Sequence, residues 1–143
     1  MHLTFVHITA RRYLASIAAN GLRAGSHFAH ADHVDVHGHL LADLTDAGHE
    51  PVVLLVEPRA FDIRHLAPAI EAIEHPMPTV LTRMCCYELQ DRWEGCSQTW
   101  RDCVDLVGVC RHLLAVPARY LSVDGRQLVA PAKAGKRRRT GRT

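Results

Sequence analysis

The sequence predicts a single α+β domain over residues 1–131, followed by a basic tail over residues 132–143. Segments typical of strands and helices follow one another without the regular alternation of a parallel βαβ sheet, so we expect a mixed architecture. The length of 143 residues suits one domain with a sizeable core. Hydrophobic residues make up 48% of the chain and charged residues 22%, which argues against a disordered or fibrous protein.

The N-terminal segment has the clearest local pattern. Residues 3–8 are β-branched or aromatic enough to form a strand. Thr9 is placed to cap a helix that begins at Ala10, because apolar side chains recur after it at helical spacing. Gly21 ends that helix, since glycine readily takes the left-handed conformation of a helix stop. We therefore predict a strand, a tight turn, a helix and a glycine stop over residues 3–22.

The later elements are predicted from shorter signals. A continuous apolar run between Pro51 and Pro58 is typical of a strand buried on both faces, and the pair Asp124-Gly125 predicts a turn. In chain order, the other expectations are a strand at 27–30, a helix within 37–46, a loop with a short helical turn at 68–78, a strand within 79–88, a helix from 97 or 99 to about 115, and a strand at 116–123.

Charge is distributed unevenly along the chain. The net charge is +2, yet residues 132–143 include six basic residues and no acidic one. The rest of the chain has 11 basic and 15 acidic residues, a balance of about −4. The tail has no apolar side chain larger than alanine and cannot offset its ordering entropy by burial, so we expect it to be disordered. It either adds sequence-independent attraction to nucleic-acid phosphates or serves as a solubilising extension.

The sequence lacks the signals of membrane insertion and of export. No apolar run approaches the ~20 residues that span a bilayer. The N-terminal residues have neither a basic region nor an apolar stretch of signal-peptide length. Five cysteines, an odd number, are most simply reduced thiols. We therefore expect a cytoplasmic protein with no membrane partner, while the sequence leaves the oligomeric state open.

Cysteines and histidines are the residue types that could serve a metal. Cys96, Cys103 and Cys110 are spaced by seven and are expected on one stripe of the last helix, as small buried hydrophobes. Six of the 11 histidines lie between His27 and His49, and imidazole is a suitable ligand for divalent ions. Their spacing matches no familiar zinc motif, so no metal site is assigned. The alternative function is a non-enzymatic module that binds metal or nucleic acid through this histidine cluster and the tail.

His7 stands in a specific context at the end of the first predicted strand. The strings that follow one another there are Val6-His7-Ile8-Thr9, Tyr13-Leu14, Ile17 and Gly21-Leu22. This order resembles the opening of the ADP-ribosyltransferase fold, in the branches that begin with His-x-Thr: the RNA 2′-phosphotransferases and the DNA-targeting ADP-ribosyltransferase toxins. The string His27-Phe28-Ala29-His30 stands where the phosphotransferases have a second histidine on the next strand. The strands predicted at 52–57 and 116–123 also resemble strands of that fold.

The resemblance implies an ADP-ribosyltransferase-like split β-sheet core with flanking helices. The implied function is transfer of ADP-ribose from NAD, the co-substrate, to a nucleic-acid acceptor. Because cleavage of the nicotinamide–ribose bond creates an oxocarbenium-like centre, the protein must hold the ribose and aim an acceptor at its anomeric carbon. By this resemblance His7 would bind a hydroxyl of the ribose, backbone groups at Thr9 would hold the carboxamide of the nicotinamide, and His27 or His30 would help to fix the ribose from the second strand. These residues are therefore expected to face one pocket between the first helix and the sheet.

The remaining implied site residues are a carboxylate and several arginines. In the resembling families the third catalytic residue is often a glutamate, which would stabilise the cationic centre or activate the acceptor. We assign Glu88 to that role. The other candidates for it are Glu57 and Glu74. The arginines assigned to cofactor binding are Arg11, Arg12 and Arg23. The N-terminus of the helix predicted at Ala10 would face the NAD pyrophosphate.

Overall fold

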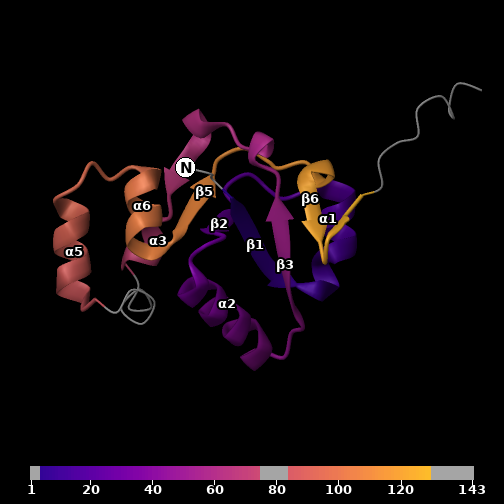
Figure 1. Cartoon of the computed structure of the whole chain (residues 1–143), viewed down its shortest axis with the longest axis horizontal. Helices are drawn as coiled ribbons and strands as arrows, with labels where there is room; N and C mark the ends of the chain where they lie inside the picture. The colour runs from indigo at the N-terminus through magenta and orange to yellow at the C-terminus, as the bar shows by residue number, and fades with distance from the viewer. Residues whose placement is uncertain (1–3, 75–83, 130–143) are drawn as a thin grey trace, which may run out of the picture.

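The structure is a computed structural model in which residues 4–74 and 84–129 are described. The predicted basic tail, and all but the last residues of the strand predicted within 79–88, lie outside the described residues. Figure 1 shows the course of the chain.

The described strands form one seven-stranded sheet in which every neighbouring pair is antiparallel. The strand order is β4-β5-β2-β1-β3-β6-β7, so β1 is the central strand. The strands are β1 (Phe5–Ala10), β2 (His27–His30), β3 (Pro51–Val56), β4 (Leu66–Pro68), β5 (Val109–His112), β6 (Leu121–Val123) and β7 (Arg126–Gln127). The predicted α+β architecture is confirmed at this level.

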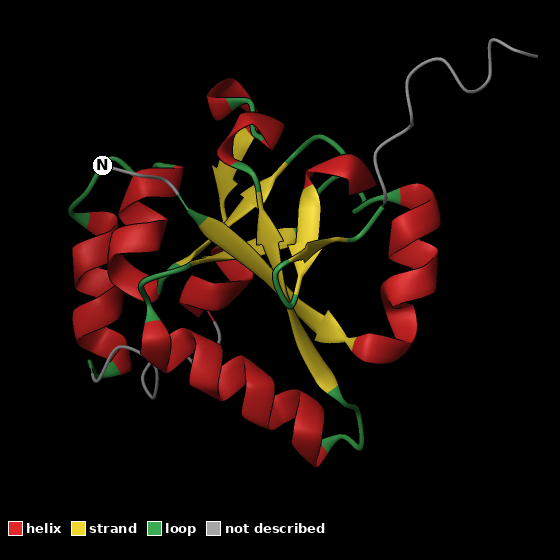
Figure 2. Ribbon diagram, turned by 45° about the vertical axis from the view of Figure 1, so that its right-hand side comes forward, coloured by secondary structure: helices red, strands yellow, loops and turns green. Residues whose placement is uncertain are grey.

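Helices surround the sheet on both faces and at both ends. They are α1 (Leu14–Asn20), α2 (Val34–Asp46), α3 (Ile70–Glu74), α5 (Cys86–Glu94) and α6 (Trp100–Val107), with 3-10 turns η1 (Arg11–Tyr13), η2 (Pro58–Ala60), η3 (Ile63–His65) and η4 (Ala118–Tyr120). Figures 1 and 2 place α1 at one side of the molecule and α5 and α6 at the opposite side. α2 packs on β1 and β3, and α6 packs on β4 and β5.

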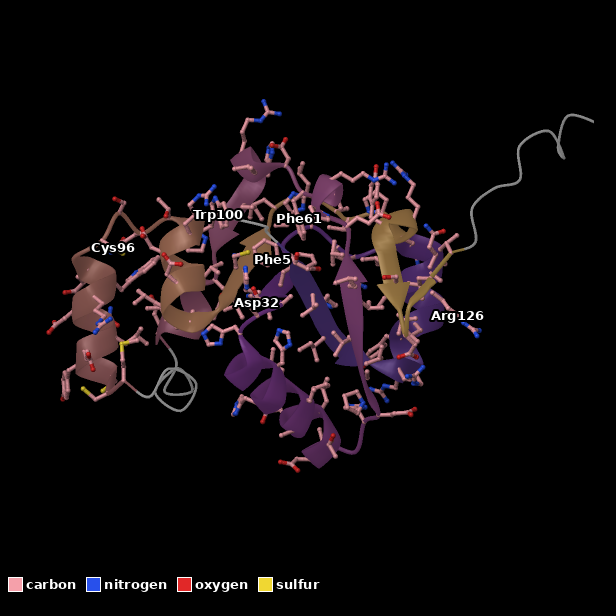
Figure 3. The ribbon with its side chains drawn as sticks, in the orientation of Figure 1. Phe5, Asp32, Phe61, Cys96, Trp100 and Arg126 are labelled. Carbon is pink, nitrogen blue, oxygen red and sulfur yellow. The ribbon has the colours of Figure 1, made fainter. Side chains whose placement is uncertain are left out.

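The main core lies on the face of the sheet that α1 covers. Phe5 of β1 meets Phe61 and Trp100 edge to face, with ring centroids 5.3 and 6.4 Å apart (Figure 3). A second cluster of buried side chains lies among α3, α5 and α6 and includes Leu89 and Trp93. The sheet is therefore anchored at two places, and the central strand β1 belongs to the larger one.

The two ladders of β1 differ in length. Its ladder with β3 runs over the whole strand, from Phe5 opposite Val56 to Ala10 opposite Pro51. Its ladder with β2 ends after Val6 opposite Ala29. Beyond that pair the sheet forks between β1 and β2, and the next residue of β1 is His7. We call this place the fork.

The first predicted helix begins later than the sequence suggests. Thr9 and Ala10 continue the ladder with β3 rather than capping a helix, so the prediction of a helix start at Ala10 is wrong. A 3-10 turn follows, and the α-helix begins at Leu14 with no side-chain cap. The backbone of Thr9 and Ala10 is paired with β3, so these two residues do not start the helix. The predicted stop at Gly21 is confirmed, with φ at +72°.

The C-terminal half departs from the prediction in two helices. The helix expected to reach about residue 115 ends at Gly108, whose φ is +78°, and residues after it form β5. Its start is confirmed, because Thr99 and Asp102 form a reciprocal capping box. Residues 86–94 form a helix where a strand was predicted within 79–88, with the Cys85 sulfur accepting a hydrogen bond from the Glu88 N–H.

The structure corrects three smaller predictions. The strand at 51–58 ends at Val56 and is not buried on both faces, since Val53 and Leu55 are exposed on the side away from the main core. The strand predicted at 116–123 is reduced to β6, preceded by η4. The three cysteines do not share a helix: Cys96 precedes α6, Cys103 lies on it and Cys110 lies on β5.

The strand at 27–30, the helix within 37–46 and the Asp124-Gly125 turn are confirmed.

The stop at Gly21 leads to a stability prediction. A Cβ at this position would lie 2.4 Å from the Val116 carbonyl oxygen, which accepts a hydrogen bond from the Leu22 N–H. Gly21→Ala should therefore lower the free energy of unfolding by about 2–4 kcal/mol, through positive-φ strain and this clash together. Gly125→Ala is the matched control, because its φ is +77° but open space surrounds its Cβ position. Equal losses in urea denaturation would contradict the clash.

Candidate functional site

His7 lies at the fork and reaches across it. Its Nδ1 lies 2.8 Å from the His27 carbonyl oxygen, and its ring lies beside Phe28, with centroids 5.6 Å apart. Because a carbonyl oxygen only accepts hydrogen bonds, Nδ1 has the proton and Nε2 of the neutral ring is an acceptor. Burial lowers the pKa of His7 below the ordinary histidine value of 6.5. His7 is thus a neutral hydrogen-bond acceptor near pH 7.

Two neighbouring cavities open at the fork. The first, of about 390 Å³, is lined by His7, His27 and Phe28 together with residues of α2 and β5. The second, of about 310 Å³, is lined by Thr9 and Arg23 together with residues of α1. Ser26 lines both, so we treat them as one site and call it the fork cleft. Each is of the size that small-molecule sites have in proteins.

The structure divides the residues that were expected to face one pocket between the first helix and the sheet over two cavities. His7 and His27 share one cavity, and Thr9 and Arg23 line its neighbour. His30 is not among the residues that line either cavity. Its ring packs against Phe5, with centroids 5.8 Å apart, and its Nδ1 accepts a hydrogen bond from the Asp32 N–H. Of the two histidines on β2, the structure brings His27 to His7.

A glutamate that the sequence did not single out lies next to His27. Glu71, on α3, has its Oε2 3.3 Å from the His27 Nε2. The pKa of Glu71 is lowered, first by a hydrogen bond from its own backbone N–H and then by His27. Arg111 stands opposite His27 in the ladder between β2 and β5, and its charge also lowers the pKa of Glu71. Because 44 residues separate the two partners, no local signal could have indicated this pair.

The glutamate assigned from the sequence lies elsewhere. Glu88 is on α5, which packs against α3 and α6 at the edge of the molecule (Figure 1). It is paired with Arg92, one helical turn further on, at 3.1 Å. Glu57 follows β3 and binds Arg59, with 2.6 Å between Oε2 and Nε. The assignment of Glu88 to the site with His7 is therefore not reproduced, because the fold uses α5 to close the second core cluster.

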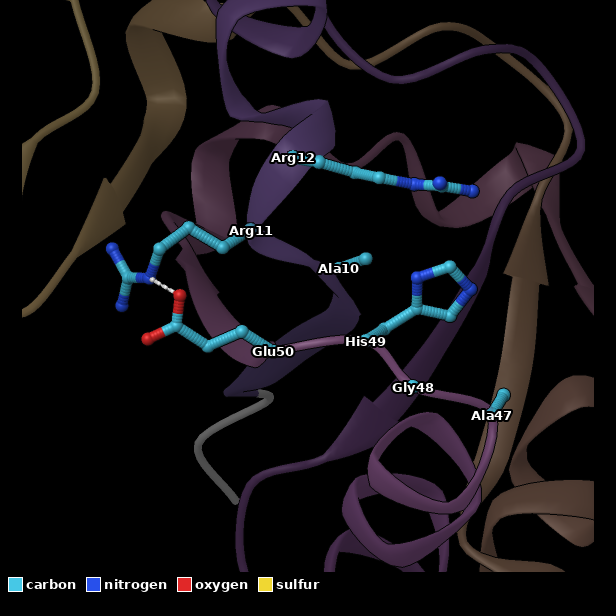
Figure 4. A pocket seen from close by; sticks show the side chains of 7 residues that line it. All are labelled: Ala10, Arg11, Arg12, Ala47, Gly48, His49 and Glu50. Atoms are coloured by element: carbon cyan, nitrogen blue, oxygen red, sulfur yellow. Dashed lines mark ion pairs between the residues drawn. The ribbon is translucent and has the colours of Figure 1, made fainter.

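Arg11 and Arg12 also lie apart from the fork cleft. They line a third cavity, of about 520 Å³, together with the loop between α2 and β3 (Figure 4). Arg11 is already paired with Glu50 at 3.3 Å and with Asp124 at 3.5 Å. The helix that would have faced a pyrophosphate begins only at Leu14. Of the arginines assigned to cofactor binding, Arg23 alone lines the fork cleft.

Two other histidines of the cluster, His37 and His39, have structural contacts. His37 donates from Nε2 to the His30 carbonyl oxygen at 2.8 Å, which ties α2 to the end of β2. His39 lies 3.3 Å from the Asp43 carboxylate on the same helix. Within residues 4–74 and 84–129, no group of three or more histidine, cysteine or acidic side chains is placed to hold a metal ion.

Comparison with known protein families, curated proteins and solved structures finds no match to this chain. Among the described residues, none of the helices is both long and apolar enough to cross a membrane. The interpretation of the site therefore depends on its own geometry and chemistry.

Proposed function

We propose that the chain transfers ADP-ribose from NAD to an acceptor on nucleic acid. The observation that supports this most is the position of His7: it lies where β1 and β2 separate and shares a cavity with His27. The resemblance of the Val6–Thr9 string to ADP-ribosyltransferases implies a split-sheet core and a histidine on the first strand that binds the ribose. The end of the ladder after Val6 leaves His7 beside a gap between β1 and β2, which supports the proposal.

The chemistry assigns a part to each residue of the fork cleft. Nicotinamide leaves with the electron pair of its bond to the ribose, and an acceptor nucleophile forms the new bond to the anomeric carbon. The neutral His7 Nε2 accepts a hydrogen bond from a ribose hydroxyl, which holds the ring as positive charge develops on it. His27, whose Nε2 donates to Glu71, holds the ribose from β2. Arg23 contributes positive charge for the NAD phosphates on the side of Thr9.

The direct test is the release of nicotinamide from NAD. The full-length chain is incubated with NAD and a single-stranded oligonucleotide, and nicotinamide and modified oligonucleotide are quantified by chromatography and mass spectrometry. We expect both products, in equal amounts when the acceptor is in excess. Absence of nicotinamide release with DNA and with RNA would overturn the proposal. A chain that binds the oligonucleotide and leaves NAD intact would instead favour the non-enzymatic alternative.

The proposed support of His27 by Glu71 predicts a small effect on turnover. Both side chains are about half exposed, so their ion pair is worth less than about 1 kcal/mol. Glu71→Gln should therefore lower the rate of nicotinamide release by less than about ten-fold, in keeping with that energy. Glu94→Gln, which changes an exposed carboxylate on α5, is the control and should leave the rate unchanged. A loss above about 100-fold would make Glu71 a directly catalytic group instead of a positioning residue.

A further inference from the structure

The third cavity, which we call the Arg12 groove, has rigid walls. It lies between residues 10–12 and the loop at residues 47–50. The Arg11 N–H donates to the Glu50 carbonyl oxygen at 2.8 Å and joins the two walls. The loop is held by hydrogen bonds from the Gly48 and His49 N–H groups to carbonyl oxygens at the end of α2. Backbone hydrogen bonds thus hold the two walls of the groove together.

The charges of the groove are not all paired. Arg11 is neutralised by Glu50 and Asp124. Among the described residues, no carboxylate lies within ion-pair distance of Arg12, which donates to the Tyr13 hydroxyl at 2.7 Å and stacks on that ring at 4.8 Å. In Figure 4 the Arg12 side chain extends above the His49 ring, on the same side of the groove. A guanidinium and an imidazole thus line the groove, and the carboxylate that lines it with them, Glu50, is paired with Arg11.

We propose that the Arg12 groove binds a phosphodiester of the nucleic-acid acceptor, outside the fork cleft that takes NAD. Naming nucleic acid as the ligand rests on the proposed function. Guanidinium groups bind phosphate oxygens through paired N–H donors, and an imidazole adds a further donor. Glu50 on its wall disfavours a terminal phosphate, whose charge is about −1.5 to −2, more than a singly charged diester.

The groove and the fork cleft are close enough to share one strand. Thr9 of the cleft and Arg12 of the groove are three residues apart, which limits their Cα separation to about 11 Å. Tyr13, which lines the cleft, is the partner of Arg12. A strand with one phosphate at Arg12 would therefore run beside Thr9 and Tyr13, at the edge of the fork cleft.

Binding of a fluorescent single-stranded oligonucleotide, measured by anisotropy without NAD, tests this assignment. Arg12→Gln should weaken binding several-fold and reduce the slope of log affinity against log salt by about 0.7, the value for one phosphate contact on a single strand. Glu50→Gln should strengthen binding. The control is Arg101→Gln, because Arg101 stacks on Trp100 at 4.6 Å much as Arg12 stacks on Tyr13, but lies on α6. That change should leave the slope unaltered.

Two competitors distinguish the source of the phosphate. A dinucleoside monophosphate has one diester and no terminal phosphate, so it should displace the oligonucleotide from the wild type and less so from Arg12→Gln. Inorganic phosphate at the same concentration should displace less. Equal slopes for Arg12→Gln and Arg101→Gln would overturn the groove as a binding site, and stronger competition by inorganic phosphate would overturn the diester. Because NAD is absent, neither result depends on whether the chain cleaves NAD.

Discussion

Replacing His7 with alanine should lower the rate of nicotinamide release from NAD by at least about 100-fold, the scale expected when a reacting group loses its positioning contact. The same change should alter the free energy of unfolding by only ~1–2 kcal/mol, as is usual for a point substitution. The difference arises because the His7 side chain makes one hydrogen bond across the fork, to the His27 carbonyl oxygen, and leaves Nε2 for a ligand. Chromatography of the reaction and urea denaturation measure the two effects.

A second histidine provides the control for this substitution. His39 lies on α2 with Asp43 as its partner, and it lines none of the fork cleft. His39→Ala should leave nicotinamide release unchanged. Equal rates for His7→Ala and the wild type would contradict the role of His7, and a His7→Ala protein that no longer unfolds cooperatively would show that the residue serves the fold instead.

The pH dependence of the same reaction follows from the protonation state of His7. The acceptor role needs the neutral ring, and burial lowers the pKa of His7 below 6.5. The acid limb of the rate profile should therefore lie below pH 6.5, because the ring stays neutral until the pH falls to its lowered pKa. An acid limb above pH 6.5 would require another titrating group or a charged His7.

The parts of the fold that were predicted correctly depend on signals within a few neighbouring residues of the sequence. Gly21 ends α1 because only a residue tolerant of positive φ fits there, and Asp124-Gly125 forms its turn for the same reason. The prediction that Thr9 caps a helix was wrong because Thr9 pairs with Val52 of β3, which is 43 residues away in the sequence. The helix predicted to reach about residue 115 ends at Val107, because the residues after Gly108 pair with β2 and β4 as β5. Local chemistry thus indicated which elements form, and pairing decided where they end.

The candidate site was likewise predicted from the sequence only in part. His7 and His27 could be proposed from the sequence, since each lies on a strand with a recognisable pattern. Their shared cavity depends on the early end of the ladder between β1 and β2, which no single-strand pattern encodes. Glu71 joins the site only because α3 returns to the start of β2. Glu88, which was assigned from the sequence instead, lies on a helix that packs in another cluster.

A buried histidine outside the fork cleft should have the largest effect on stability among the histidines. His112 is 1% exposed. Its Nδ1 donates to the Leu114 carbonyl oxygen at 3.0 Å, and its Nε2 accepts from the Asp62 N–H at 3.0 Å. The ring also packs edge to face on Phe61, with centroids 5.2 Å apart. It thus joins the end of β5 to the segment before β4 through two polar contacts and one aromatic contact.

Substitution of His112 by alanine should lower the free energy of unfolding by about 3–5 kcal/mol. The change leaves a cavity and strands two backbone groups, the Asp62 N–H and the Leu114 carbonyl, without their partner. His65→Ala is the control, since the His65 side chain is partly exposed and its ion-pair contact is with the nearby Asp62 carboxylate. It should cost less than about 1 kcal/mol. Urea denaturation at pH 7.5 compares the two variants with the wild type.

The same histidine makes the stability of the fold depend on pH. Burial lowers the pKa of His112, and protonation of Nε2 would break its bond from the Asp62 N–H. The unfolded chain takes up the proton near pH 6.5, before the folded chain does, so stability rises with pH across this range. The free energy of unfolding should be at its full value above about pH 6.5 and should decline below it, toward the lowered pKa. This decline should be shallower in His112→Ala. A parallel decline in both proteins would show that His112 is not the group that senses the acid.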